Sequence, residues 1–319
     1  MNLINRTLAL ACMVSLGLLS ACGEDDGDGT VTPAITCSGD NSINTTDVGC
    51  DMQPTKPNEY SEVVSGDVRT ITTNTYPNHE FSVREGATVN IFNRIYTIDA
   101  TPAVAASSTS VLNEQNRPRY YHGVALNGIP FDPAPAEPFI FENTQTGEYN
   151  WDWVFEPNTN KTEVELDCAT AHVGPFGYHY HGDMAVYADL LSAGISTGSI
   201  PSGPVQIGWA ADGFPVLYKY GPDASGSLTL LKPSYKVKAG ERSGDGVSEP
   251  CGEYSGKYTN DYEFVSGLGD LDECNGVKRS ITLTTDNGTQ TFSYFYVITD
   301  DFPVMSRCIV GTPDASFTK

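Results

Sequence analysis

Residues 286–298 read DNGTQTFSYFYVI, a turn followed by a run of β-branched and aromatic residues. Asn287-Gly288 is a strong hairpin signal, because this pair tolerates the positive φ angles of a two-residue type I′ turn. The segments on either side, 280–283 and 291–298, alternate polar and apolar residues as half-buried strands do. The stretch therefore predicts a β-hairpin.

The same alternation recurs outward from this hairpin. It is found at residues 80–83, 88–92, 96–98, 148–155 and 205–209. Stretches rich in Pro, Gly and Ser, typical of long loops, lie at 101–118, 192–204 and 239–257. Asp183 is expected to cap one short helix over 184–191 that stops near Gly194. These patterns predict a mainly β fold, a sandwich or barrel-like single domain with long loops and one short helix.

The composition is that of an acidic, folded protein. Its 319 residues include 18 Lys and Arg against 40 Asp and Glu, so the formal net charge is −22. This balance excludes the basic surface that nucleic-acid binding requires. Hydrophobic residues make up 39% of the chain, too many for a disordered acidic protein. We therefore expect a folded domain with no nucleic-acid partner.

The beginning of the chain has the pattern of a secretory signal peptide. Arg6 precedes an apolar run over 8–19 that is too short to span a membrane. The run ends in Leu19-Ser20-Ala21-Cys22, which resembles a bacterial lipobox. The resemblance implies cleavage before Cys22, its acylation and a lipid anchor in the cell envelope, and Gly23 favours the outer membrane. The alternative is a plain secretory signal with an incidental cysteine.

Three segments are expected from these patterns. They are a lipoprotein signal peptide over 1–21, an acidic flexible tether over 22–59 that contains Cys37 and Cys50, and a β-rich domain over 60–319. The tether is rich in Gly and acidic residues at 23–34, where no apolar period is present.

Six cysteines remain after Cys12 leaves with the signal peptide and Cys22 takes lipid. An even number in an oxidising compartment predicts three disulfides, and the absence of Cys-x-x-Cys spacing argues against a cysteine-rich zinc site. By proximity in the sequence and elimination, we expect the pairs Cys37–Cys50, Cys251–Cys274 and Cys168–Cys308.

Three of the five histidines, His172, His179 and His181, lie within ten residues. In an extended segment His179 and His181 point to one face, about 6.5 Å apart, while Tyr178 and Tyr180 pack on the other. A turn in the intervening Gly-Pro-Phe-Gly segment can bring His172 back to the same point. Imidazoles so placed suit a transition metal such as zinc or copper. The alternative is a histidine pair that bonds the backbone or a substrate without metal.

The other two histidines carry weaker signals. His79 lies between Asn78 and Glu80 and is expected to be exposed. His122 stands at the entrance of a predicted strand, where it is either a core residue or a further member of the site.

Several motifs surround the histidines in a specific order. Residues 178–181 read YHYH, preceded by HGVALNGIPF at 122–131 and followed by GWAADGFPV at 208–216, DLDECNG at 270–276 and TDDFP at 299–303. Together with Cys308 and Gly311, they resemble the YHYH-domain family of exported bacterial proteins over roughly residues 120–312. The resemblance implies family membership rather than a particular activity.

One departure from this family concerns a second element. Its members commonly repeat a Tyr-His-Tyr-His-like sequence just before the closing Asp-Phe-Pro. Here residues 294–297 read YFYV, so Phe295 and Val297 replace both expected histidines. Any site in this chain must therefore rest on the first element and on carboxylates.

Four acidic residues are candidate partners of the histidine cluster. Asp212 follows an apolar strand, and Asp270, Asp272 and Glu273 lie in a loop beside Cys274. A carboxylate there could complete a metal shell or orient a ring nitrogen. Alternatively, Asp212 stabilises its own turn and the other three belong to a solvated loop.

Two functions from different classes follow. The first is an envelope lipoprotein that uses the cluster to bind a transition metal or a small ligand. The second is a metal-dependent hydrolase or oxidoreductase with Asp212 or Glu273 as base. A structural or adhesion role without metal is a third. Neither a Gly-x-Ser-x-Gly motif nor a Gly-rich phosphate loop supports another enzyme class.

Overall fold

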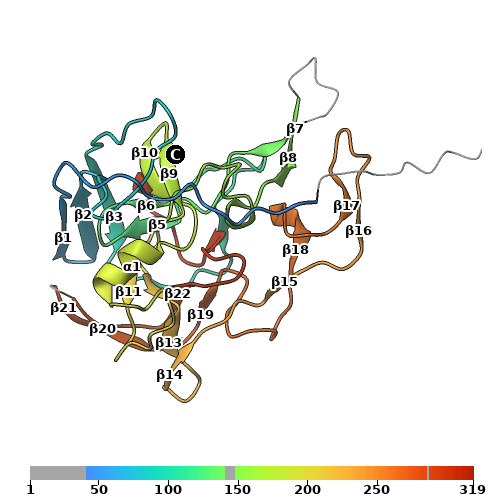
Figure 1. Cartoon of the computed structure of the whole chain (residues 1–319). Helices are drawn as coiled ribbons and strands as arrows, with labels where there is room; N and C mark the ends of the chain where they lie inside the picture. Colours follow the sequence, from blue (N-terminus) through green and yellow to red (C-terminus); the bar gives the residue numbers. More distant parts are fainter. Residues whose placement is uncertain (1–40, 141–147, 286) are drawn as a thin grey trace, which may run out of the picture. The chain divides into compact units, whose positions relative to one another are not determined.

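The computed structural model describes residues 41–140, 148–285 and 287–319, whose path is shown in Figure 1. The predicted signal peptide, Cys22, Cys37 and the acidic stretch at 23–34 lie outside these residues. Within the described ranges, no helix is both long and apolar enough to cross a membrane.

The largest element is an open sheet of eight short strands. In spatial order they are β19 (Gly276–Val277), β22 (Phe295–Ile298), β12 (Pro215–Tyr218), β11 (Gln206–Ala210), β5 (Gly123–Ala125), β6 (Pro130–Phe131), β10 (Gly177–Tyr180) and β9 (Ala171–Gly174). The pairs β12–β22 and β6–β10 are parallel, and the others are antiparallel. Every residue of β10, β12 and β22 is buried, as expected for strands covered on both faces.

A second, three-stranded sheet contains β1 (Tyr60–Ser65), β2 (Val68–Thr73) and β3 (Arg94–Asp99). Its inner face is joined to the large sheet through Trp209 on β11. The guanidinium of Arg69 lies 3.7 Å from the centre of the Trp209 ring, a cation–π contact. Glu62 accepts hydrogen bonds from Arg69 Nη1 and Trp209 Nε1, each at 2.8 Å. These buried polar contacts connect the two sheets.

The remaining described strands form two-stranded ribbons. They are β4 (Thr109–Ser110) with β23 (Cys308–Ile309), β7 (Pro138–Ile140) with β8 (Tyr149–Val154), β13 (Tyr220–Pro222) with β14 (Leu228–Leu230), β15 (Tyr235–Val237) with β18 (Tyr262–Phe264), β16 (Glu241–Ser243) with β17 (Cys251–Glu253), and β20 (Ile281–Thr285) with β21 (Gly288–Phe292). One α-helix, α1 (Ala185–Leu191), and the 3-10 turns η1 (Pro157–Thr159), η2 (Thr259–Asp261) and η3 (Ala315–Phe317) complete the fold. The predicted mainly β fold with one short helix is confirmed.

Local predictions differ from the structure in several places. The predicted hairpin forms as β20 and β21, but the run 291–298 divides because its second half leaves to pair with β12 and β19. The runs 80–83 and 88–92 form no strand, and Phe81 makes only an isolated bridge to Met52. The predicted loop 239–257 contains the β16–β17 ribbon.

The helix is not capped as predicted. Met184 is the N-cap of α1, and no side chain caps it. The carboxylate of Asp183 instead accepts a hydrogen bond from the Tyr218 hydroxyl at 2.5 Å and lies 3.1 Å from Lys219 Nζ. The carboxylate is therefore engaged by Tyr218 and Lys219 instead of by the first turn of the helix.

Residues 41–59, assigned above to the tether, lie against the domain. Asn44 and Met52 form isolated β-bridges with Asn160 and Phe81. A disulfide joins Cys50 to Cys168 across 118 residues. The described part of this segment is therefore held by covalent and backbone contacts and differs from a free linker.

The three predicted disulfide pairings are wrong, although the five cysteines in the described part of the chain are oxidised. Cys50 pairs with Cys168 and Cys274 pairs with Cys308, while Cys251 is also disulfide-bonded. Cys37, the sixth cysteine, lies outside the described residues. The pairing follows the packing of distant segments, which proximity in the sequence does not reveal.

Candidate metal centre

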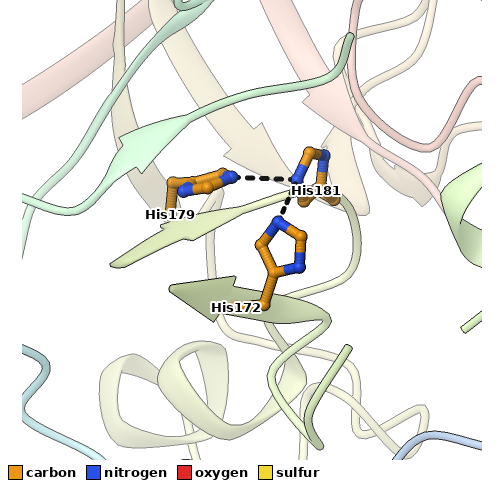
Figure 2. Close-up of side chains that lie close together, drawn as sticks. All are labelled: His172, His179 and His181. Carbon is orange, nitrogen blue, oxygen red and sulfur yellow. Dashed lines mark hydrogen bonds between the residues drawn. The ribbon is translucent and has the colours of Figure 1, made fainter. Parts of the chain in front are cut away.

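The three clustered histidines lie on one β-hairpin. His172 on β9 and His179 on β10 are directly opposite each other in the antiparallel register. His181 follows β10, and its ring contacts both of the others (Figure 2). His181 Nε2 is 3.0 Å from His179 Nε2 and 3.1 Å from His172 Nε2. The prediction that a turn returns His172 to the histidine pair is confirmed.

Two glycines make this hairpin possible. Gly177 has a φ of +108°, a conformation that residues with a side chain rarely adopt. A Cβ on Gly174 would lie 2.7 Å from Cε1 of the His179 ring, so a side chain there would displace the imidazole. The Gly-Pro-Phe-Gly segment therefore shapes both the turn and the space that His179 occupies.

The tautomers of two rings follow from their hydrogen bonds. A carbonyl oxygen can only accept, so Nδ1 of His172 donates to Val164 O at 2.8 Å and Nδ1 of His179 donates to Gly177 O at 3.0 Å. Burial lowers the pKa of each of these imidazoles to about 4, so both are neutral at pH 7. Each ring therefore presents the lone pair of Nε2 to the cluster.

These nitrogens have the geometry of a metal site. One ring nitrogen of each histidine lies within 4.8 Å of those of the other two. Tetrahedral zinc with Zn–N bonds of about 2.0–2.1 Å separates its ligand nitrogens by about 3.3 Å. The separations of 3.0 and 3.1 Å come close to that value. Three histidines are also the protein ligands of one class of catalytic zinc site.

A cavity of 410 Å³ opens beside the histidines, and Asp132 lines it with them. Asp132 directly follows β6, and its amide donates to Tyr180 O at 2.8 Å across the parallel β6–β10 pair. Its Oδ2 lies 3.8 Å from His179 Nε2 and accepts a hydrogen bond from Lys319 Nζ. Burial raises the pKa of Asp132, and the Lys319 ammonium opposes that rise. No motif in the sequence marks this carboxylate.

Asp212 is not brought to the cluster. Its carboxylate accepts hydrogen bonds from the Tyr296 hydroxyl at 2.7 Å, Gly311 N at 2.8 Å and Phe214 N at 3.2 Å. Burial is the main cause of the raised pKa of this group. Asp212 therefore stabilises its turn and the closing segment, which is the alternative stated for it above.

The other three acidic candidates also lie apart from the histidines. Asp272 accepts hydrogen bonds from Cys274 N and the Tyr294 hydroxyl, and Asp270 accepts one from Lys232 N. They precede β19 together with Glu273, at the edge of the eight-stranded sheet opposite β9. The width of the sheet separates this loop from the cluster.

The second Tyr-His-Tyr-His-like element, residues 294–297, is part of the core. Phe295 and Val297 on β22 are fully buried, in keeping with the loss of the two histidines. The hydroxyl of Tyr296 donates to Asp212, and the hydroxyl of Tyr178 in the first element donates to Asp167 Oδ2 at 2.6 Å. Both elements thus retain a buried tyrosine–aspartate hydrogen bond, but only the first carries imidazoles.

His79 and His122 are both buried. The expectation that His79 is exposed is wrong, because its Nε2 lies 2.7 Å from the Tyr180 hydroxyl and its Nδ1 bonds Glu80 O. His122 is a core residue whose ring meets the Tyr296 ring edge-on. Neither nitrogen of His122 has a hydrogen-bond partner among the described residues.

Replacement of His122 by Phe is expected to stabilise the fold, by about 1–3 kcal/mol at pH 7, because it removes two unpaired polar atoms and keeps an aromatic ring. Burial lowers the pKa of His122 to about 3. Below about pH 6.5 this imidazole therefore binds a proton in the unfolded chain but not in the native state, and the free energy of unfolding falls. Urea unfolding should show a larger gain at about pH 4.5 than at pH 7. An equal gain at both pH values would contradict this account.

Comparison with known proteins identifies one family. Residues 95–311, about two thirds of the chain, match the family described as YHYH protein. No curated protein and no solved structure matches the chain. The matched region contains the β9–β10 hairpin with its three histidines, Asp132 and the modified second element, and the chain therefore belongs to the YHYH protein family.

Proposed function

We propose that this protein is a cell-envelope lipoprotein that binds one transition-metal ion, zinc or copper, through Nε2 of His172, His179 and His181. One observation carries the proposal: the three Nε2 atoms converge while two of the rings give their Nδ1 hydrogens to backbone carbonyls. Neutral nitrogen lone pairs that face one another repel unless a proton or a cation lies between them.

The envelope location rests on the sequence. The signal-like run and the lipobox-like Leu19–Cys22 segment support export, acylation of Cys22 and an anchor in the outer membrane. The protein would then contact the membrane only through its lipid anchor. The folded domain would bind its metal ion or small ligand outside the cytoplasm.

A second candidate function is metal-assisted hydrolysis, and one observation favours it. Catalytic zinc sites have three protein ligands and keep one position for water. The histidines border the 410 Å³ cavity, where Asp132 lies 3.8 Å from His179 Nε2. Asp132 therefore replaces Asp212 and Glu273 as the candidate base.

Metal content tests the main proposal. The mature protein, expressed without a histidine tag, is expected to contain about one zinc or copper ion per chain by elemental analysis. After removal of the ion with a chelator, Co²⁺ should restore one equivalent and give the intense visible absorption of a four-coordinate site. Protein that remains free of metal after incubation with excess Zn²⁺ and Cu²⁺ at neutral pH would contradict the proposal.

A further inference from the structure

The two oxygens of the Asp132 carboxylate have different surroundings. The side chain is buried, with 4% of its surface exposed. Lys319 Nζ donates to Oδ2, whereas Oδ1 has no hydrogen-bond donor among the described residues. An unpaired buried carboxylate oxygen is costly, and a bound donor is one explanation for its presence.

Lys319 also lines the cavity, and contacts outside the histidine cluster fix its position. Its backbone amide donates to Arg119 O at 2.9 Å, and its ammonium lies 5.1 Å from the centre of the Tyr121 ring. Lys319 is therefore held at Oδ2 by contacts outside the histidine cluster. The ammonium favours the ionised form of Asp132, which can accept hydrogen bonds but cannot donate them.

The cavity brings the Asp132 carboxylate to the metal site, where Oδ2, the oxygen that Lys319 holds, lies 3.8 Å from His179 Nε2. Asp132 and the three histidines line the same space, so a group bound to the ion from the cavity side would lie beside the carboxylate. A coordinating atom that carries a hydrogen can donate to Asp132. An aprotic anion would instead place its lone pairs against those of the carboxylate oxygen.

From this geometry we infer that Asp132 selects the class of ligand at the metal. The site accepts molecules whose coordinating group carries a hydrogen, such as water, alcohols and hydroxamic acids, and it discriminates against aprotic anions such as azide. Asp132 acts here as a specificity-determining residue. The inference rests on the proposed metal site and adds the chemistry of the ligand.

Ligand titrations of the Co²⁺-loaded mature protein test this inference. The visible spectrum reports binding of azide and of acetohydroxamic acid, and the quantity compared is the ratio of their dissociation constants. In Asp132→Asn the amide can turn its N–H toward the ligand, so azide binding should strengthen and hydroxamate binding should weaken. We expect the azide-to-hydroxamate ratio to fall by about tenfold or more. An unchanged ratio would overturn the inference.

Glu137→Gln is the matched control. Glu137 also lines the cavity, and its carboxylate already accepts a hydrogen bond from Ala136 N at 2.9 Å. This variant also removes one carboxylate from the cavity. If the lost charge alone were responsible, Glu137→Gln would change the ratio of dissociation constants as much as Asp132→Asn does. That result would overturn the inference, whereas a ratio within about twofold of wild type supports it.

Two further outcomes are informative. If Asp132→Asn does not fold, Asp132→Ser offers a hydroxyl that can donate or accept, and the ratio should fall in the same direction. Wild-type protein that binds no Co²⁺ refutes the proposed function itself. Wild-type protein that binds Co²⁺ while both Asp132 variants keep the wild-type ratio refutes only the selection by Asp132.

Discussion

The double substitution His179→Ala and His181→Ala is expected to weaken zinc binding by more than about 100-fold. Loss of one residue that only hydrogen-bonds a metal ligand already weakens binding by up to about 100-fold, and this variant loses two ligands. The two residues supply two of the three converging Nε2 atoms. His172 alone would remain on β9, and a single imidazole does not hold a transition metal against water and buffer. Isothermal titration of the chelator-treated proteins with Zn²⁺ measures the difference.

Two controls separate loss of ligands from loss of fold. His122→Phe removes a buried imidazole outside the cluster and should bind zinc as the wild type does. His179→Gln with His181→Gln keeps more of the buried volume than the alanines and should still lose the metal. Equal zinc content in the wild type and the double alanine variant would remove the hairpin from consideration as the site.

Removal of the Cys50–Cys168 disulfide should produce the largest loss of stability. The bridge closes a loop of 118 residues, for which chain entropy gives about 5 kcal/mol of stabilisation at 25 °C. It also attaches residues 41–59 to the segment just before β9. We therefore expect Cys50→Ser with Cys168→Ser to lower the free energy of urea unfolding by several kcal/mol and to free this segment for proteolysis.

The second described disulfide provides the comparison. Cys274–Cys308 closes 34 residues, so the same relation gives about 4 kcal/mol. Removal of this bridge should cost less than removal of Cys50–Cys168 and should leave residues 41–59 protected. The reverse order of stabilities would show that strain or contacts in the native state, and not loop entropy, govern these bridges.

Several parts of the fold could be predicted because their signals are local. The Asn-Gly turn predicted the β20–β21 ribbon, and the apolar run after Asp183 predicted α1. The alternation over 291–298 predicts a single continuous strand, because periodicity does not show where a strand changes partner. Its division at Ser293-Tyr294 depends on β12 and β19, which lie far away in the sequence.

The cysteines show the same limit. Their number predicted oxidation, and the described ones are disulfide-bonded. Their pairing requires knowledge of which segments pack together over separations of 34 and 118 residues. Proximity in the sequence is a poor guide to such contacts, so each predicted pair was wrong.

The histidine cluster could be found in the sequence alone, because the alternation of a strand and one glycine-bounded turn suffice to place His172, His179 and His181 together. The carboxylate beside them could not. Asp132 reaches the cluster because β6 pairs in parallel with β10, where Phe131 lies opposite Tyr180. Asp272 is excluded because β19 forms the far edge of the same sheet. Short-range periodicity places side chains on one face of a hairpin, whereas only long-range strand order decides which distant acid lies next to them.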